Sequence, residues 1–419
     1  MIVPGTELIW SSKIEGDELK DILTTLKGKY GDTWNTTNKN GSRWFLYETY
    51  ANDLAKKVRE EKKKENKLVR FIDSSFEYKF INDYIDLSIQ YSEYALSDKS
   101  VIVRLKDNSI ELPVVNQKHI DEIIENMEYE QAKFTPVKAK ITQKHAILAD
   151  ITVFNNGQEI KELSVQNKQL IVARIDDEFG MLSNILGMKK GETKDFVFTP
   201  QNEKFKEISL NCKVSIYEVY DIKKPALDDK YVKTLKIKDV NTIAEFKAFL
   251  HLQQKLEVME KFMTNYLKKI SPEIINISKI DIPASFINCF YIANSLKEQV
   301  RINKEFGGLK NYLSISKITE EQLNEGIWRY STLEAMYEIL KFEIHSKYVY
   351  KRDEKLFKEF EETVVKAHNK VDFDIRDDFN YKQKMGNSYQ ILETFLAIVS
   401  LSNQVFYKEH FKDKKFPFI

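Results

Sequence analysis

The spacing of apolar residues changes in the middle of the chain, and this change is the strongest constraint on the fold. Between residues 138 and 220, apolar residues form short alternating runs such as "AILADITVF" (146–154), as strands do. After "KKPALDD" (223–229) they recur every three or four residues up to the C-terminus, as in amphipathic helices. The pattern predicts an α+β, multidomain protein in which a β unit precedes a long helical unit.

Two glycines flank a turn in "LGMKKGETKDFVF" (186–198). Gly187 and Gly191 lie four residues apart before an aromatic and β-branched run, and glycine adopts a positive φ at no steric cost. The stretch therefore predicts a helix end, a tight turn and a strand. Asn156 and Gly157 follow an alternating run, which predicts a hairpin.

Helix-start signals recur in the helical part. Thr242 with Glu245, and Thr319 with Gln322, have the spacing of capping boxes. Pro283 stands where proline favours the start of a helix. Other patterns predict helices over 14–30, 43–66, 114–134, 352–368 and 387–410, strands within 71–94, 101–105 and 211–222, and a flexible break at 303–318.

Composition narrows the class of protein. The 419 residues suffice for two or three domains, and Lys+Arg 65 against Asp+Glu 64 gives a net charge of +1, which argues against nucleic acid as a partner. No apolar run approaches the ~18 residues that span a membrane, and the first ten residues lack the pattern of a signal peptide. With only two cysteines and no disulfide framework, we expect a cytoplasmic protein with no membrane partner.

The common catalytic motifs are missing from the sequence. The six histidines are scattered, without an HExxH pair or another metal-ligand spacing, so we expect no metal. There is no GxxxxGK[ST] and no GxSxG, so we expect no nucleotide or other cofactor and no serine nucleophile. Cys212 and Cys289 are expected as buried apolar residues rather than reactive thiols.

Three segments carry a family resemblance. "VVNQKHIDEIIENM" (114–127), "LGMKKGE" (186–192) and "VSIYEVYDIKKPALDDKYVKTL" (214–235) resemble trigger factor, a bacterial ribosome-associated chaperone with an FKBP-type prolyl isomerase domain. The likeness spans about residues 114–300. "LKGKYGD" (26–32) and "YETYANDLAKKVREE" (47–61) resemble the helices after the family's ribosome-docking loop, but the loop's Gly-Phe-Arg-Lys signature is not found. We therefore expect the docking region to be truncated or lost.

The resemblance implies four parts. They are a truncated α+β N-terminal domain at 1–113, a connecting helix at 114–137, a degenerate FKBP-like antiparallel β domain at 138–224, and a helical C-terminal chaperone domain with long arms, of trigger factor or SurA type, at 225–419.

An isomerase pocket of this type is an apolar, aromatic-walled cup that lowers a barrier of about 18–20 kcal/mol by desolvating the prolyl amide. Anchoring on Gly157 and Met188 aligns this chain with the family's pocket residues. Where the family pattern has aromatic or aliphatic side chains, or a Phe-Asp pair, this chain has Asp150, Ile160, Lys161, Asp177, Glu178, Met181 and Cys212. Carboxylates oppose the burial of an uncharged ring. We therefore expect no confident catalytic residue and a loss of isomerase activity; any enzyme activity would be FKBP-type peptidyl-prolyl cis-trans isomerisation.

The resemblance implies an ATP-independent chaperone that binds unfolded or nascent polypeptide in a cradle of helical arms. The aromatic residues of the arms are the client-binding candidates: Phe246, Phe249, Phe286, Phe290, Tyr291, Trp328 and Tyr337. Ribosome docking through the family's loop is not expected. Two alternatives stay open: an assembly component or dedicated escort that binds one folded protein partner, and an active prolyl isomerase.

Overall fold

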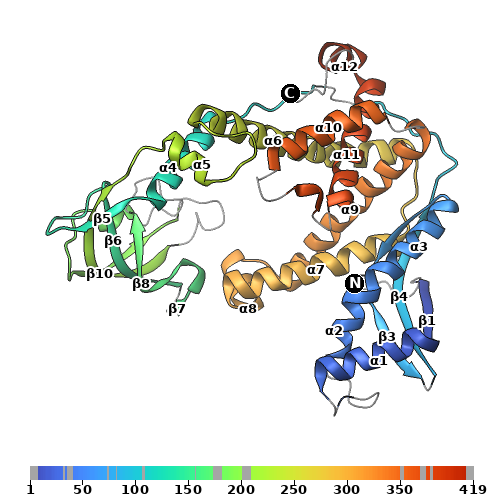
Figure 1. Ribbon diagram of the computed structural model, residues 1–419, viewed down its shortest axis with the longest axis horizontal. Coiled ribbons are helices and arrows are strands. Elements are labelled where there is room, and N and C mark those ends of the chain that lie inside the picture. Colours follow the sequence, from blue (N-terminus) through green and yellow to red (C-terminus); the bar gives the residue numbers. More distant parts are fainter. Residues whose placement is uncertain are drawn as a thin grey trace.

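The computed structural model describes residues 8–31, 34, 41–72, 75–81, 83–105, 109–155, 157–172, 182–200, 209–349, 353–368, 374–377 and 381–411. Figure 1 shows an elongated molecule, with a β domain at one end and the N-terminal sheet and C-terminal helices at the other. Long helices join the two ends. The expected α+β, multidomain class is confirmed, with two separate sheets and a helical body.

The N-terminal sheet is antiparallel, with β4 at its centre. Its strands are β1 (Leu8–Glu15), β2 (Lys67–Phe71), β3 (Glu77–Ile81) and β4 (Tyr84–Ala95). One core packs this sheet against α1 (Gly16–Tyr30), α2 (Ser42–Leu46), the π-helical η1 (Tyr47–Ala51) and α3 (Asn52–Lys64). Side chains from α1, α3 and β4 meet there, where Leu26, Val58 and Ile85 are fully buried. The helix expected from residue 14 begins at Gly16, because Ile14 and Glu15 pair in β1.

The β domain is a second antiparallel sheet with its own core. Its elements are β5 (Lys133–Pro136), β6 (His145–Asn155), β7 (Gln158–Glu159), η2 (Lys161–Leu163), β8 (Val165–Val172), η3 (Leu182–Ile185), β9 (Thr193–Phe198) and β10 (Leu210–Lys223). Strand β10 pairs with β6 on one side and with β9 and β5 on the other, so the strand expected at 211–222 is the central one.

The glycine turn before β9 has the conformation that its sequence predicts. Gly187 and Gly191 have φ of +87° and +84°, and the short helix η3 ends just before them. Their amides donate to the carbonyls of Ile141 and Ile216, at 2.9 and 2.8 Å. The two glycines therefore fix the turn against two different parts of the β domain.

The helical body contains the expected long helices. They are α6 (Ile243–Ile277), α7 (Ala284–Phe306), α8 (Leu309–Ser316), α9 (Glu320–Tyr348), α10 (Glu354–His368), α11 (Tyr381–Ser402) and α12 (Gln404–His410). Both capping boxes are confirmed, and Pro283 directly precedes α7. Within the break expected at 303–318 the helical run is interrupted at Gly307 and Gly308 and again at Lys317, and the short helix α8 lies between these interruptions.

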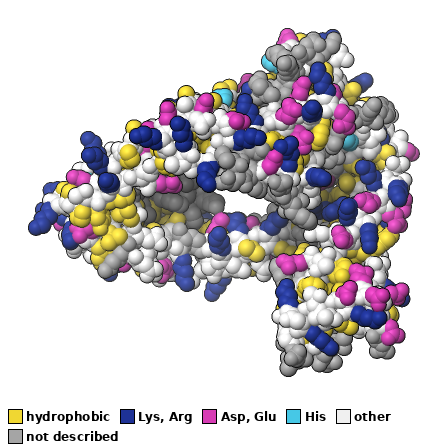
Figure 2. Space-filling model, in the orientation of Figure 1, with side chains coloured by type: hydrophobic (Ala, Val, Ile, Leu, Met, Phe, Trp, Pro, Cys, Tyr) yellow, Lys and Arg dark blue, Asp and Glu magenta, His cyan; other side chains and the backbone are white. Residues whose placement is uncertain are grey.

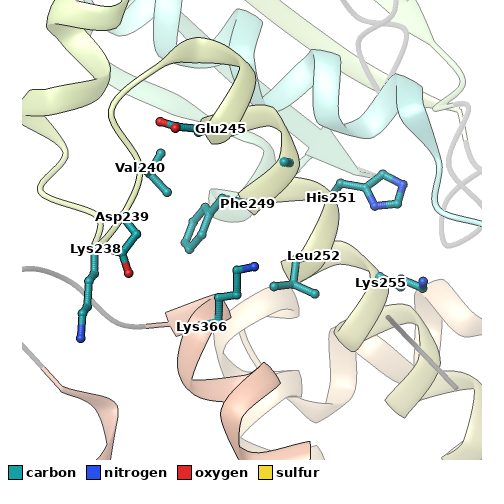
Figure 3. A pocket seen from close by; sticks show the side chains of 10 residues that line it. Lys238, Asp239, Val240, Glu245, Phe249, His251, Leu252, Lys255 and Lys366 are labelled. Atoms are coloured by element: carbon teal, nitrogen blue, oxygen red, sulfur yellow. The ribbon is translucent and has the colours of Figure 1, made fainter. Parts of the chain in front are cut away.

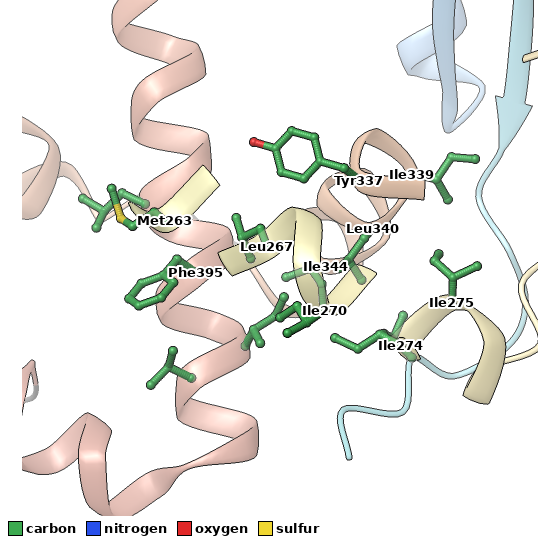
Figure 4. Packing of buried hydrophobic residues seen from close by; sticks show 14 of the residues in the cluster. Met263, Leu267, Ile270, Ile274, Ile275, Tyr337, Ile339, Leu340, Ile344 and Phe395 are labelled. Atoms are coloured by element: carbon green, nitrogen blue, oxygen red, sulfur yellow. The ribbon is translucent and has the colours of Figure 1, made fainter. Parts of the chain in front are cut away.

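The main core lies where α6, α9 and α11 pack together (Figure 4). Leu267 of α6 and Leu340 of α9 are fully buried there, and so is Phe395 of α11. Phe395 also contacts the rings of Phe262 and Tyr266 edge-on, at 5.9 and 5.5 Å between centroids. Aromatic and aliphatic residues from distant parts of the chain thus share one core.

The strand expected at 101–105 is wrong. This segment forms no ladder and lies instead against the helical body. The hydroxyl of Tyr348 donates to the carbonyl of Val101 at 3.1 Å, and the amide of Ile102 donates to the hydroxyl of Ser278 at 2.8 Å. Side-chain hydroxyls of Ser278 and Tyr348 thus satisfy backbone groups that a neighbouring strand would otherwise pair.

A small cluster, here called the joint, connects the β domain to the body. It lies where α4 (Gln117–Glu130) and α5 (Asp229–Thr234) meet the start of α6. Asn116 caps α4 as expected, with its side chain accepting from the amide of Lys118. The buried residues of the joint are Ile120, Val232, Ile237, Val240, Phe246 and Leu250.

Candidate functional site

The aligned isomerase positions do not gather into one cup in the described part of the β domain. Ile160 and Cys212 are buried in its core, whereas Lys161 is exposed at the start of η2. Asp150 lies on β6 between the buried Ala149 and Ile151, and alternation along the strand places it on the opposite face of the sheet. Asp177, Glu178 and Met181 lie outside the described residues.

The surroundings of two of these positions are defined in the β domain. Burial, with a contribution from the nearby carboxylate of Asp195, raises the pKa of the Cys212 thiol to about 12, so the thiol stays protonated and unreactive at neutral pH. Asp150 accepts a hydrogen bond of 2.8 Å from the hydroxyl of Tyr217, on the outer face of the sheet. Cys212 lines a cavity of about 250 Å³ together with Phe154, Phe196 and Val197, whereas Asp150 is not among the residues that line it.

Most of the aromatic client-binding candidates are buried. The buried ones are Phe246, Phe286, Phe290, Tyr291 and Tyr337. The other two are half-buried: Phe249 stacks on Phe246 at 6.4 Å, and Trp328 packs against Tyr291 at 5.5 Å. Five of the seven candidates therefore lack a surface that a client could reach, because helical spacing marks an apolar face but does not say whether another element covers it.

A different set of apolar side chains is exposed on the hairpin that α7, α8 and α9 form. Contacts between α7 and α9 show that the two helices are neighbours: Asn294 donates to Glu334 at 2.8 Å, and Tyr291 contacts Trp328. Five side chains of this hairpin are at least 38% exposed and are here called the arm surface: Leu296, Val300, Leu309, Tyr330 and Leu333.

The arm surface continues a face of α7 that is covered nearer its start. Cys289, Ala293, Leu296 and Val300 follow one another at spacings of four, three and four, so they lie on one side of the helix. At Cys289 this side meets the N-terminal sheet, because its thiol contacts the carbonyl of Arg70 at 3.6 Å. Cys289 and Ala293 are buried, whereas Leu296 is 42% and Val300 is 68% exposed. The apolar face therefore extends into solvent beyond the contact with the sheet.

Figure 2 shows an open hollow through the middle of the molecule. The β domain lies at one end of it and the helical body at the other, with the α4–α6 region along one side and the α7–α8 hairpin along the other. The hairpin also approaches the β domain, since α7 contacts η2. These two sides, the α4–α6 region and the α7–α8 hairpin, are here called the limbs. They border the hollow from opposite sides.

A second concave feature, here called the basic pocket, lies where the chain enters α6 (Figure 3). It is a cavity of about 370 Å³ between the segment before α6, the first turns of α6 and the end of α10. Its lining residues are Lys238, Asp239, Val240, Glu245, Ala248, Phe249, His251, Leu252, Lys255 and Lys366. Phe249 is the only client-binding candidate that lines this pocket.

Within the described ranges, no group of three or more His, Cys, Asp or Glu side chains is placed to hold a metal ion. None of the described helices is both long and apolar enough to cross a bilayer.

The sequence predicted neither the arm surface nor the basic pocket. Leu296, Tyr330 and Leu333 appear in it as members of packing faces, although all three are at least 39% exposed. The available signal was Val300, an apolar residue between Gln299 and Arg301 that continues the apolar face of Cys289, Ala293 and Leu296. The pocket combines residues more than a hundred positions apart, which no local pattern marks.

Comparison with known proteins gives a consistent result at the level of sequence. No family model matches the chain. It is 26% identical over 222 residues to trigger factor of Caldicellulosiruptor saccharolyticus, covering 52% of this chain and 50% of that one. It is 25% identical over 248 residues to trigger factor of Borrelia duttonii, covering 57% of this chain and 52% of that one. It is also 25% identical over 276 residues to trigger factor of Malacoplasma penetrans, covering 58% of each chain. The chain spans about half the length of the curated relatives it matches.

A solved structure described as "Promiscuous Substrate Recognition in Folding and Assembly Activities of the Trigger Factor Chaperone" aligns with 94% of this chain and 97% of its own. Its TM-score is 0.31 at 14% identity, which is too low to support an argument. The resemblance to trigger factor is therefore supported by the sequence relatives. These relatives support the interpretation of the chain as a divergent member of the trigger factor family.

Proposed function

We propose that this protein is an ATP-independent chaperone that holds unfolded or nascent polypeptide beside the hollow between its limbs. The observation that carries the proposal is the arm surface, a set of exposed apolar side chains on a packed helical hairpin. Exposed apolar groups on an ordered scaffold favour contact with the apolar residues of unfolded chains. Similarity to the trigger factor family supports the same function.

Weak individual contacts suit repeated binding and release. A patch that buries about 200 Å² of apolar surface at about 25 cal/mol per Å² gives about 5 kcal/mol before the costs of ordering the client. Several such contacts hold a flexible chain by avidity, and each is weak enough to open thermally. Release then needs no nucleotide, in agreement with a sequence that contains no P-loop.

The same proposal includes the loss of prolyl isomerase activity. Asp150 on the outer face of the sheet, the buried Ile160 and the protonated Cys212 replace the aromatic cup that the resemblance implies. Prolyl isomerisation of this type depends on desolvating the amide, and a carboxylate opposes this. A proline tetrapeptide assay should therefore show no acceleration over the spontaneous rate, and measurable acceleration would restore the isomerase alternative.

Aggregation of a chemically denatured model protein tests the chaperone function directly. We expect the wild-type chain to suppress light scattering at an equimolar ratio without nucleotide. Val300→Asp introduces a charge into the arm surface and should reduce suppression several-fold. Val405→Asp on α12 is the matched control, because Val405 is 67% exposed and Val300 is 68% exposed, both on helices.

Two outcomes would contradict the proposal. One is a wild-type chain that leaves light scattering unchanged at equimolar amounts. The other is an equal loss of suppression in both valine variants, which would show that the arm surface has no special role. Affinity capture from whole lysate separates the remaining alternative: a dedicated escort returns one stoichiometric protein, whereas a chaperone returns many.

A further inference from the structure

The basic pocket owes its shape to a bend before α6. Asp239 has a left-handed backbone, with φ of +61°, in the segment that leads from α5 to the capping box of α6. Lys366, in the last turn of α10, closes the opposite wall. The side chain of Gln253 ties these parts together by donating to the carbonyl of Ala367 at 2.8 Å. The walls therefore come from fixed elements of the helical body.

The rim of the pocket carries an excess of positive charge. Lys238, Lys255 and Lys366 line it, and within the described residues none of them forms an ion pair. Of the two carboxylates present, Glu245 already accepts hydrogen bonds from the amides of Asn241 and Thr242, at 2.7 and 3.0 Å. Asp239 is left as the one lining carboxylate outside the capping box, so the three lysines outnumber it.

The floor of the pocket is apolar. Val240 is buried, and the side chains of Phe249 and Leu252 are half-buried. Figure 3 shows the ring of Phe249 and the side chain of Lys366 extending into the same space. The ring is held in place by stacking on the buried Phe246 at 6.4 Å. An occupant therefore meets a preorganised apolar surface with cations around it.

This combination does not suit a phosphate group. Phosphate sites at the start of a helix use free backbone amides. Here the amide of Ile243 donates to the carboxylate of Asp229 at 2.8 Å, and the amide of Glu245 donates to the hydroxyl of Thr242 at 3.2 Å. The carboxylate of Asp239 would repel a doubly charged anion. A single carboxylate beside an apolar side chain matches both the rim and the floor. The volume of about 370 Å³ is small for a ligand pocket, so it fits one or two side chains.

We propose that the basic pocket binds a polypeptide segment in which an aspartate or glutamate lies next to a phenylalanine or leucine. The carboxylate pairs with the lysines, and the apolar side chain packs on Phe249 and Leu252. This rests on the proposed chaperone function and specifies the chemistry of one class of client segment. The pocket is a specific contact, in addition to the general apolar contacts of the arm surface.

Fluorescence anisotropy with the full-length chain and short labelled peptides tests the proposal. The probe contains the sequence Phe-Asp between Gly and Ser residues, and its three variants replace Asp by Asn, Asp by Lys, or Phe by Ser. We expect the first peptide to bind tightest and its affinity to fall as salt rises. The double variant Lys238→Gln/Lys366→Gln should lower its affinity by about tenfold. Lys56→Gln/Lys57→Gln, at two exposed lysines of α3, is the charge-matched control and should change nothing.

Three results would overturn the proposal: equal binding of the Lys peptide, an unchanged affinity in the pocket double variant, or displacement of the probe by low millimolar inorganic phosphate. Failure of the pocket and failure of the chaperone function are distinguishable. If the chain suppresses aggregation but the pocket double variant binds the probe normally, only the pocket assignment fails. If the probe binds as expected but aggregation is not suppressed, only the chaperone function fails.

Discussion

The N-terminal sheet and the β domain are both antiparallel, but they are attached to the helical body in different ways. The N-terminal sheet shares the body's core: the ring of Tyr94 on β4 lies 6.4 Å from that of Phe286 and 6.1 Å from that of Phe342. The β domain keeps a core of its own, and none of its described buried residues belongs to the core of the joint or of the body. One sheet is thus part of the body and the other is an attached unit.

Polar contacts strengthen the difference. Glu343 of α9 is fully buried and accepts from the hydroxyl of Tyr94 at 2.5 Å and from the amide of Ser97 at 2.8 Å. Lys347 forms an ion pair with the same carboxylate and donates to the carbonyl of Lys99 at 2.5 Å. The buried carboxylate of Glu343 is thus contacted both by residues 94–97 and by α9, and these contacts hold the two segments in one arrangement.

The polar contacts of the joint are more exposed. Lys224 pairs with Glu125 at 2.8 Å, and the amide of Leu227 donates to Glu128 at 3.3 Å. Exposed pairs of this kind contribute about 0–1 kcal/mol. We infer that the N-terminal sheet and the body unfold together, whereas the β domain can open by itself.

The largest expected effect is that of Glu343→Ala. It leaves the Lys347 ammonium and the Tyr94 hydroxyl without their buried acceptor, so the unit of sheet and body should lose about 3–5 kcal/mol. Tryptophan fluorescence during urea unfolding measures this unit, because all four tryptophans (10, 34, 44 and 328) lie outside the β domain. Glu338→Ala, which breaks a more exposed pair with Lys341, is the control on the same helix. Equal effects of the two variants would contradict a special role for Glu343.

The two cysteines provide a second, intermediate test. Cys212 is buried in the β domain and Cys289 is buried where α7 meets the N-terminal sheet, so each reports the opening of one region. If the β domain opens independently, Cys212 should react with a thiol reagent at least about tenfold faster than Cys289. Cys212→Ala and Cys289→Ala assign the two rates. Equal rates would show that the molecule opens as one unit.

The smallest expected effect is at alkaline pH. Burial, followed by the Asp195 carboxylate, raises the pKa of Cys212 from 9.0 to about 12, so the folded β domain disfavours the thiolate that the unfolded chain forms. The resulting stability is fully present below pH 9 and declines as pH rises toward 12. Hydrogen exchange of β6 and β10 should speed up more between pH 9 and 10.5 in the wild type than in Cys212→Val, after correction for the intrinsic rate. The same slope in both proteins would exclude Cys212 as the cause.

Local signals in the sequence predicted much of the fold. The capping boxes at Thr242 and Thr319, the N-cap at Asn116 and the turn at Gly187 each depend on residues within a few positions, and all four are confirmed. The segment 101–105 has the composition of a strand, but its partners are the side chains of Ser278 and Tyr348. Such a tertiary contact overrides local propensity, and no local pattern contains it.

The candidate site was less predictable for the same reason. Phe286 and Leu296 are both apolar residues of α7, yet the first is buried in the core of the body and the second is exposed. Which part of a face is covered depends on where another element ends. The basic pocket joins Lys238 to Lys366 only because α10 returns to the start of α6.

The hydrogen bond between Tyr94 and Glu343 joins residues that are 249 positions apart in the chain. During synthesis, therefore, the first sheet to leave the ribosome is the last to reach its final surroundings, because α9 must be made before β4 can be covered. The β domain lies between these two segments and needs neither of them. We expect it to complete its structure first, while the strands made before it still wait for their helical partners.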